Sequence, residues 1–504
     1  MRVPGFTDQT GMAARDRRSF LYRLHRWAGM VACGGVMMWG LSGVLHPVMS
    51  RLQPRPVTFA APAQIVQLQG ARPLSVVLRQ NHLDVVDWFR VVSWPAGVFY
   101  QVAVPGHAEL RYFDAKNGEL FAAGDRKYAE FLARHYLGDA SSALSSIALV
   151  SGFDIDYSRI NRLLPVYRVA FIRNDGMRAY VDTATSRLAT LVDDRKALLS
   201  TVFQTLHTWF FMQGRPWLRL VFMSIFLGAA ALTIGLGVWI YCNRAVDPAR
   251  SNSLRRWHRT LAAGVAFFTA SSVFSGVLHL FKEPSRAVAE TPLRDTGFRV
   301  ADFVIAPEQA LAVGAGTRDT VHIAPARVDG AVYYRMRQAS AQPGRHGHDH
   351  DHAAPGVSPA APPVLVGAVD GQVLENGEQR YLQSLAQTFS RLPADGISTM
   401  MDVARFTDEY GFDLKRLPVV RVSYTTGDGS RYYIEADTAT LSARINDGDA
   451  REGWTFAYLH KLEWLTPLSE LLRDGVSIVA ALCGVLVAGM GMLLFAKTRR
   501  RSPY

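Results

Sequence analysis

The chain has 504 residues, a formal net charge of +12, and 49% hydrophobic against 19% charged residues. This length is sufficient for several domains, and the balance of apolar and charged residues is typical of a membrane protein with large soluble parts. The basic residues cluster beside long apolar segments, which argues against the basic surface of a nucleic-acid-binding protein. Three cysteines without a CxxC spacing give no thiolate metal site or disulfide framework. No GxGxxG, P-loop, HExxH or GxSxG motif occurs, so nothing supports nucleotide-dependent, zinc-protease or hydrolase chemistry.

The first apolar segment, residues 26–48, follows an Arg-rich start at 1–25 and is predicted to cross the membrane. It is too long for the apolar core of a signal peptide and lacks an A-x-A cleavage site, so we expect an uncleaved helix. Glycine and serine are frequent in it, which allows a neighbouring helix or a flat ligand to approach closely. Pro47 is predicted to end this helix.

Residues 49–212 form the first of two large polar regions. The β-branched and aromatic composition of strands is found at 97–104, 111–113 and 167–172. Glycine-containing turn sequences follow these segments. We therefore expect small α+β domains built from antiparallel hairpins.

Three further apolar segments bring the number of predicted membrane spans to four. The parts after residue 212 are span two at 217–241, a connector at 242–259, span three at 260–281, a second polar region at 282–470, span four at 476–496 and a tail at 497–504. Arg and Lys at both termini and in the connector indicate that these parts are cytoplasmic. The sequence therefore predicts a multi-pass membrane protein with both polar regions outside the cytoplasm, which in a bacterium means the periplasm.

An internal duplication runs through the sequence. Ser-Gly-Val-Leu-His occupies 42–46 and again 275–279, and a second motif, Phe-x-x-Leu-His, occupies 203–207 and 456–460. Each half is therefore predicted to be a helix, an external domain and a helix. Because both halves run in the same direction, we expect a pseudo-twofold axis along the membrane normal.

Six histidines occupy equivalent positions in the two halves: His25, His46 and His207 in the first, and His258, His279 and His460 in the second. Within each half, 21 residues separate the first two, which is roughly 31 Å of helix and leaves both side chains within roughly 60° of one face. Paired imidazoles at both ends of helices rich in small residues are suited to hold iron porphyrin through two axial ligands, one from each half. Two alternatives stay open: ordinary interfacial residues, or a non-haem metal or proton-relay site.

The sequence resembles the PepSY-associated transmembrane family, whose better-understood members are similar to bacterial inner-membrane ferric-siderophore reductases with b-type haem. The resemblance is carried by Leu-His-Arg-Trp-Ala-Gly at 24–29, Leu-Ser-Gly at 41–43, Trp-His-Arg at 257–259, Leu-His at 206–207 and 459–460, and the PepSY-like segments 112–120 and 180–185. It covers nearly the whole chain apart from an insertion at 342–363. The family's usual Asp-Pro-x-Thr-Gly turn is replaced by Asp-Thr-Ala-Thr at 182–185 and 437–440.

The resemblance implies a helical membrane bundle of two tandem helix-domain-helix repeats with periplasmic α+β PepSY-like domains. It implies two b-type haems, one held on the cytoplasmic side by His25 and His258 and one near the outer face. Whether the outer iron is held by His46 and His279, or by a set that includes His207 and His460, stays open. His207 and His460 could instead line the substrate site or hold another haem. The implied activity is reduction of a ferric siderophore or another ferric chelate, which releases Fe(II). The electrons would come from quinol or from a separate cytoplasmic reductase.

The insertion at 342–363 contains alternating His and Asp. His346, His348, His350 and His352 are candidate ligands for Zn, Cu or Ni. The alternative is a flexible low-complexity segment that binds metal only adventitiously. A non-enzymatic interpretation of the whole chain also stays open: a membrane-anchored periplasmic binding or regulatory module in which this segment buffers metal.

Overall fold

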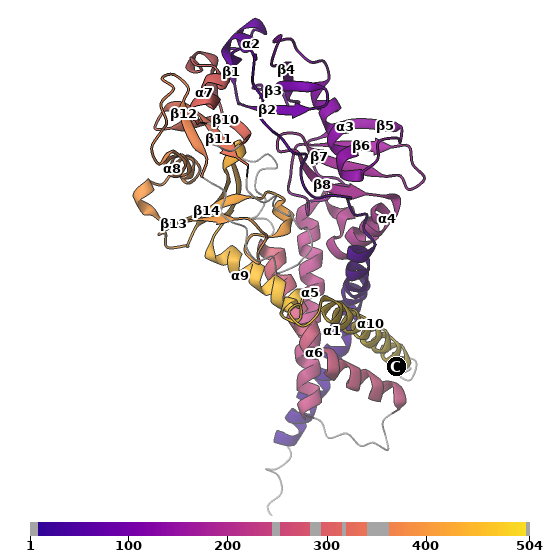
Figure 1. Ribbon diagram of the computed structural model, residues 1–504. Coiled ribbons are helices and arrows are strands. Elements are labelled where there is room, and N and C mark those ends of the chain that lie inside the picture. The colour runs from indigo at the N-terminus through magenta and orange to yellow at the C-terminus, as the bar shows by residue number, and fades with distance from the viewer. Residues whose placement is uncertain (1–8, 244–251, 283–293, 315–318, 340–361, 500–504) are drawn as a thin grey trace, which may run out of the picture. The chain divides into compact units, whose positions relative to one another are not determined.

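The computed structural model describes residues 9–243, 252–282, 294–314, 319–339 and 362–499 (Figure 1). The chain divides into two compact units. A helical unit comprises residues 1–53, 196–287 and 451–504, and a sheet unit comprises residues 54–195 and 288–450. Each unit therefore draws on both halves of the sequence.

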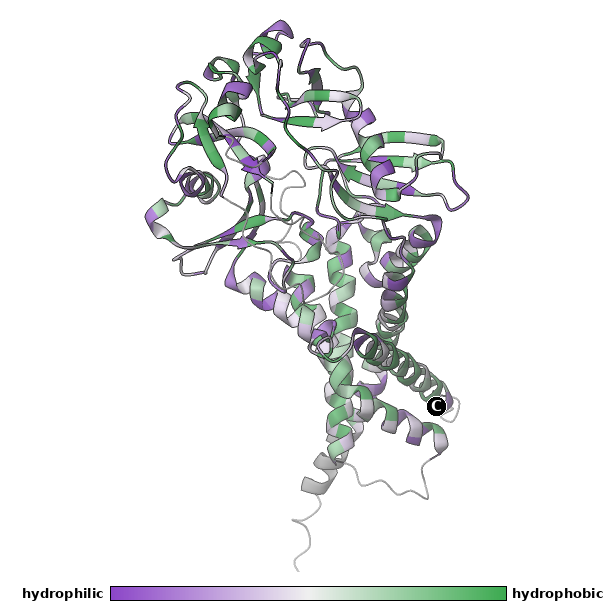
Figure 2. Cartoon of the chain, viewed as in Figure 1, coloured by the Kyte–Doolittle hydropathy of each residue, from purple (hydrophilic) through white to green (hydrophobic). Residues whose placement is uncertain are grey.

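Four long helices dominate the helical unit: α1 (Gln9–Leu52), α5 (Pro216–Asn243), α6 (Ser253–Lys282) and α10 (Glu470–Arg499). All four are long and apolar enough to cross a membrane (Figure 2). Large apolar side chains lie exposed along them, as expected for surfaces that face lipid. The prediction of a multi-pass membrane protein with four helices is thereby supported.

The four helices pack in a ring. Helix α1 packs against α5 and α10, and α6 packs against the same two helices, which places α1 and α6 on a diagonal. Small residues allow these contacts: a Cβ on Gly40 of α1 would lie 2.6 Å from Val485 of α10. Such close approach is typical of helix pairs in membranes.

Pro47 does not end the first helix, contrary to the sequence-based expectation. Helix α1 continues through Pro47 to Leu52. A proline removes one backbone hydrogen bond and crowds the carbonyl four residues earlier, which here belongs to Gly43. Because membrane helices tolerate proline where neighbouring groups compensate, one lost bond near the end of α1 does not stop it.

Short helical segments precede α5 and α10 in the same order. Helix α4 (Asp194–Phe203), a π-helical turn η1 (Gln204–Thr208) and a 3₁₀ turn η2 (Phe210–Met212) lead into α5. Helix α9 (Asp447–Thr455), a π-helical turn η9 (Phe456–His460) and a 3₁₀ turn η10 (Glu463–Leu465) lead into α10. Both π-helical turns end on or beside a histidine of the repeated Phe-x-x-Leu-His motif, and such turns are frequent at functional sites.

The sheet unit contains two antiparallel sheets from each half. In the first half, α2 (Leu74–Gln80), β2 (Trp88–Trp94), β3 (Gly97–Ala103), β4 (Arg111–Asp114), α3 (Gly124–Leu137), β5 (Leu144–Val150), β6 (Val166–Phe171), β7 (Arg178–Asp182) and β8 (Arg187–Val192) follow one another. Strands β2 to β4 form one meander and β5 to β8 another. The α+β prediction for this region is confirmed, and glycines 106, 118 and 176 adopt the positive φ that its turns require.

The second half has the same order of elements. These are α7 (Pro307–Gly314), β10 (Thr320–Val328), β11 (Ala331–Gln338), β12 (Val364–Gly367), α8 (Gly377–Ser390), β13 (Ile397–Val403), β14 (Val419–Tyr424), β15 (Arg431–Glu435) and β16 (Thr440–Ile445). Strands β10 to β12 and β13 to β16 again form separate meanders. Both halves also have a cis proline before the second strand of the larger sheet, at Pro165 and Pro418.

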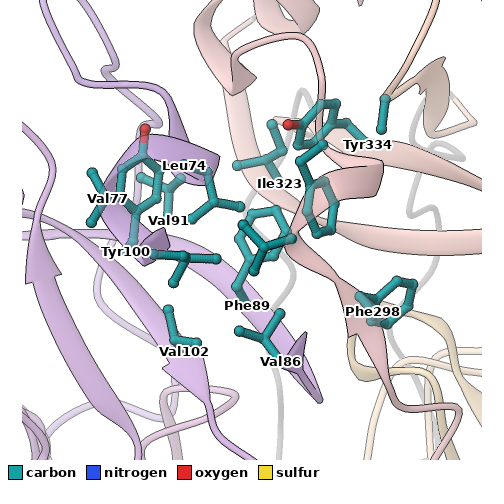
Figure 3. Packing of buried hydrophobic residues seen from close by; sticks show 14 of the residues in the cluster. Leu74, Val77, Val86, Phe89, Val91, Tyr100, Val102, Phe298, Ile323 and Tyr334 are labelled. Carbon is teal, nitrogen blue, oxygen red and sulfur yellow. The ribbon is translucent and has the colours of Figure 1, made fainter. Parts of the chain in front are cut away.

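A single hydrophobic core joins the smaller sheets of the two halves. Figure 3 shows Leu74, Val77, Tyr100 and Val102 of the first half close to Ile323 and Tyr334 of the second, with Phe89 between them. Strands β1 (Val85–Val86) and β9 (Phe298–Arg299) pair across the same junction. Helix α3 covers the larger sheet of the first half, and α8 that of the second.

Phe89 is expected to be a main contributor to this shared core. Its ring is fully buried and makes edge-to-face contacts with Phe303 and Tyr334, at centroid distances of 5.4 and 6.2 Å. Phe89→Ala should destabilise the sheet unit by about 3–5 kcal/mol, the usual cost of a phenylalanine-sized cavity. Denaturant unfolding of the full chain in detergent measures this, with exposed Ile172→Ala as the control. Equal losses in the two variants would contradict the shared core.

Candidate functional site

The first candidate pair, His25 and His258, lies toward one end of the diagonal helices α1 and α6. The two rings are within range of direct electrostatic interaction. His25 Nδ1 lies 3.2 Å from the carbonyl oxygen of Thr233 in α5, and His258 Nδ1 lies 3.1 Å from that of Val487 in α10. Because a carbonyl oxygen only accepts, each Nδ1 carries the proton, and the neutral ring keeps its lone pair on Nε2.

Glycines make room for both rings. A Cβ on Gly237 of α5 would lie 3.4 Å from His25 Cε1, and a Cβ on Gly491 of α10 would lie 3.6 Å from His258 Cε1. Both distances correspond to ordinary van der Waals contact, so each ring edge lies about one methyl group away from the glycine backbone beside it. The two histidines therefore have matching surroundings in the two halves.

The other four histidines gather at the opposite end of the same helices. A chain of ring contacts connects them through Phe203 and Phe456, and the ring centroids of its neighbours are 4.8–6.0 Å apart. The contacts, in order, are His46 with Phe203, Phe203 with His207, His207 with His460, His460 with Phe456, and Phe456 with His279. The structure thus brings together the four outer residues expected from the sequence, and His207 and His460 lie at the centre.

The central pair is deeply buried. Burial, with smaller contributions from the neighbouring His460, His46 and His279, lowers the pKa of His207 to about 3. Burial likewise lowers the pKa of His460 to about 4, with a smaller opposing contribution from the backbone of Ser272. Both imidazoles are therefore neutral at pH 7 and can act as metal ligands.

Two of the outer histidines have defined Nδ1 partners. His207 Nδ1 lies 2.9 Å from Ser42 Oγ, and that hydroxyl lies 2.9 Å from the carbonyl oxygen of Trp39. His279 Nδ1 lies 2.7 Å from Glu452 Oε1, a carboxylate only 3% exposed. The carboxylate accepts from His279, so this ring also keeps its Nε2 for another partner.

The spacing of His207 and His460 is compatible with a shared iron. Their ring centroids are 6.0 Å apart and their planes cross at 86°. Two metal–imidazole bonds of about 2.0–2.1 Å each, as known for zinc, account for about 4 Å of this separation. The remainder is about twice the distance from a ring centre to its own nitrogen. This separation is therefore compatible with both imidazoles ligating one iron ion.

A metal site with more protein ligands is not found in the part of the chain that the structure describes. No group of three or more His, Cys, Asp or Glu side chains there is arranged to hold a metal ion. A cofactor that brings its own equatorial ligands would need only two protein ligands. The four candidate ligands His346, His348, His350 and His352 lie outside the described residues.

The sequence motifs contained several site residues to which no role had been given. Ser42 and Phe203 belong to the two repeated motifs, so their recurrence beside histidines was an available signal. Glu452 had no such signal, because Leu199 stands at the corresponding place before the first Phe-x-x-Leu-His motif. Only folding reveals that Glu452 contacts His279.

No model of a known protein family matches this chain, and no curated protein sequence matches it.

Acidification should destabilise the folded chain through the central pair. Unfolded histidine has a pKa of about 6.5, so below that pH the unfolded state binds more protons than the folded state, until the folded pKa values of about 3 and 4 are reached. Stability is therefore lost as pH falls, on the order of 2 kcal/mol per histidine at pH 5. Haem-free protein unfolded by denaturant between pH 7.5 and 5 tests this. His207→Gln should reduce the pH dependence of the free energy of unfolding, and the control His107→Ala, at an exposed histidine, should not. The same pH dependence in both variants would contradict the buried, neutral state of His207.

Proposed function

We propose that the protein is a haem-b membrane oxidoreductase that carries electrons across the bilayer and reduces a ferric siderophore or another ferric chelate. One observation carries the proposal: Nδ1 of His25, His258 and His279 each lies against an acceptor oxygen, which leaves Nε2 available, and Nδ1 of His207 lies 2.9 Å from the Ser42 hydroxyl. Histidines that ligate metals almost always donate their other N–H in this way. Interfacial histidines without a ligand have no such requirement.

His25 and His258 would hold one haem, and His207 and His460 a second, with His46 and His279 beside it. The iron, when bound, supplies a one-electron Fe(III)/Fe(II) couple. The chain contributes the rest: backbone carbonyls and side chains hold the Nδ1 protons, helix packing fixes the rings, and burial keeps water from the central imidazoles. Two groups at opposite ends of α1 and α6 suit transfer from one side of a bilayer to the other.

The matching order of elements supports an internal duplication. The two halves share helix order, strand order, cis prolines and π-helical turns, and we infer that they form two tandem repeats with PepSY-like domains related by a pseudo-twofold axis. Each haem would then take one ligand from each repeat, since the offset is 233 between His25 and His258 and 253 between His207 and His460.

The proposed substrate follows from the location and the chemistry. Reduction weakens the binding of iron to hard oxygen donors such as hydroxamate or catecholate, so a periplasmic ferric chelate would release Fe(II). The chain has no recognised flavin or nicotinamide motif, and quinol or a separate cytoplasmic reductase would supply the electrons.

Absorption spectroscopy tests the cofactor. The purified full chain should show a b-type reduced-minus-oxidised spectrum, with about two haems per chain by pyridine haemochrome, and a ferric chelate should reoxidise the reduced protein. His258→Ala and His460→Ala should each lose about half of the haem, because each removes one axial ligand of a different site. His107→Ala, an exposed histidine away from both groups, should keep it. A colourless protein after expression with ample haem would exclude this function and favour the binding-module interpretation.

Reporter fusions test the orientation. The basic termini and connector predict that both polar regions face the periplasm. Alkaline phosphatase, which is active only after export, should be active when inserted in the turn at Gly106 and inactive when fused after Asn243. The reverse pattern would overturn the proposed direction of electron transfer.

A further inference from the structure

The nearest neighbours of His207 fix its protonation. The Ser42 hydroxyl has one hydrogen, and it is donated to the carbonyl oxygen of Trp39 at 2.9 Å. With the hydroxyl hydrogen directed to Trp39, the same oxygen, 2.9 Å from His207 Nδ1, is left to accept from a His207 ring protonated on Nδ1. Ser42 is completely buried, so water does not compete for this bond. Trp39 Nε1 also donates to the carbonyl oxygen of His207 at 3.1 Å and fastens η1 to α1.

The second half has the same parts, but the bond is not made. Ser275, which corresponds to Ser42 in the repeated Ser-Gly-Val-Leu-His motif, is 1% exposed. In the described part of the chain, Ser275 Oγ and His460 Nδ1 both lack a hydrogen-bond partner of good geometry. Helix α6 packs against η9 just as α1 packs against η1. The ring of His460 also has a weak hydrogen-bonding interaction with the backbone of Ser272, which corresponds to Trp39 by the same offset of 233.

These two unpaired polar groups lie on elements that pack against each other and call for a common explanation. An unsatisfied buried donor or acceptor costs about 1–3 kcal/mol, and such groups are rare in folded proteins. A bond from His460 Nδ1 to Ser275 Oγ, with the serine hydroxyl turned to the Ser272 carbonyl, would satisfy both groups. It would reproduce in α6 the arrangement seen in α1.

We propose that Ser42 and Ser275 are positioning residues that hold His207 and His460 as Nδ1-protonated tautomers, so that both rings present Nε2 to one site. Stacking on Phe203 and Phe456, at centroid distances of 4.8 and 5.1 Å, sets the ring planes. The serines then decide which nitrogen is free. The consequence for haem rests on the proposed function, whereas the tautomers themselves do not depend on it.

The first experiment reads the tautomers without haem. Haem-free full chain, labelled with ¹⁵N-histidine and reconstituted in liposomes, is examined by solid-state NMR at pH 7, where both rings are neutral. The His207 and His460 signals are identified by their loss in His207→Phe and His460→Phe. Each ring should show a protonated Nδ1 and an unprotonated Nε2 in the wild type. Ser42→Ala should shift His207, and Ser275→Ala should shift His460, toward the Nε2-protonated form.

Matched variants separate positioning from folding. Ser271 is buried in α6 and bonds the carbonyl of Phe268 at 2.9 Å, as Ser42 does that of Trp39, so Ser271→Ala should leave both tautomers unchanged. Ser42→Thr and Ser275→Thr keep the hydroxyl and should restore the wild-type signals. Nε2-protonated His207 or His460 in the wild type would overturn the proposal for that ring, as would a tautomer unaffected by loss of its serine.

The second experiment uses the haem-loaded chain. Each Ser→Ala variant should change the low-spin ferric EPR signal and raise the midpoint potential of one haem, because the ring loses the acceptor that strengthens it as a ligand. Ser271→Ala should change neither. Unchanged spectra and potentials in variants that retain haem would overturn the positioning role. A wild-type protein without haem would instead overturn the proposed function. The NMR experiment would then decide by itself whether Ser42 and Ser275 set the tautomers of His207 and His460.

Discussion

The organisation of the helical unit depends on one constraint: a neutral imidazole away from water still has one donor and one acceptor to satisfy. Leaving either unpaired in an apolar environment is costly. The fold meets half of this requirement by placing a backbone carbonyl, a serine or a carboxylate against Nδ1. The other nitrogen of each of these rings is left for a further partner.

The two halves meet this constraint in similar but unequal ways. Carbonyls of Thr233 and Val487 serve His25 and His258 alike, whereas at the other end the halves differ. Glu452 bonds His279, and the corresponding position of the first half is Leu199. A buried carboxylate on one side makes the surroundings of the outer histidines electrostatically asymmetric, even though the aromatic rings alternate in the same order on both sides.

The sheet unit is held together across the two halves as well. Phe89, Phe303 and Tyr334 pack in one core to which both halves contribute, and Arg187 of the first half forms an ion pair with the buried Glu435 of the second. Burial by itself would raise the pKa of Glu435. The charges of Arg187 and Arg416 outweigh this effect, and the pKa of Glu435 is lowered to about 2. Each half therefore has a core of its own, around α3 or α8, and shares a further core with the other half.

The sequence by itself determined the four apolar helices, the α+β regions and the six recurring histidines, because hydrophobic length, strand composition and repeated motifs are local properties. It misplaced the end of α1, since whether Pro47 is tolerated depends on the groups around the helix. It could not pair the outer histidines or find Glu452, because residues 173 positions apart meet only after folding. Only the tertiary structure decided which atoms lie against Nδ1 of His25, His207, His258 and His279, because those atoms come from other helices.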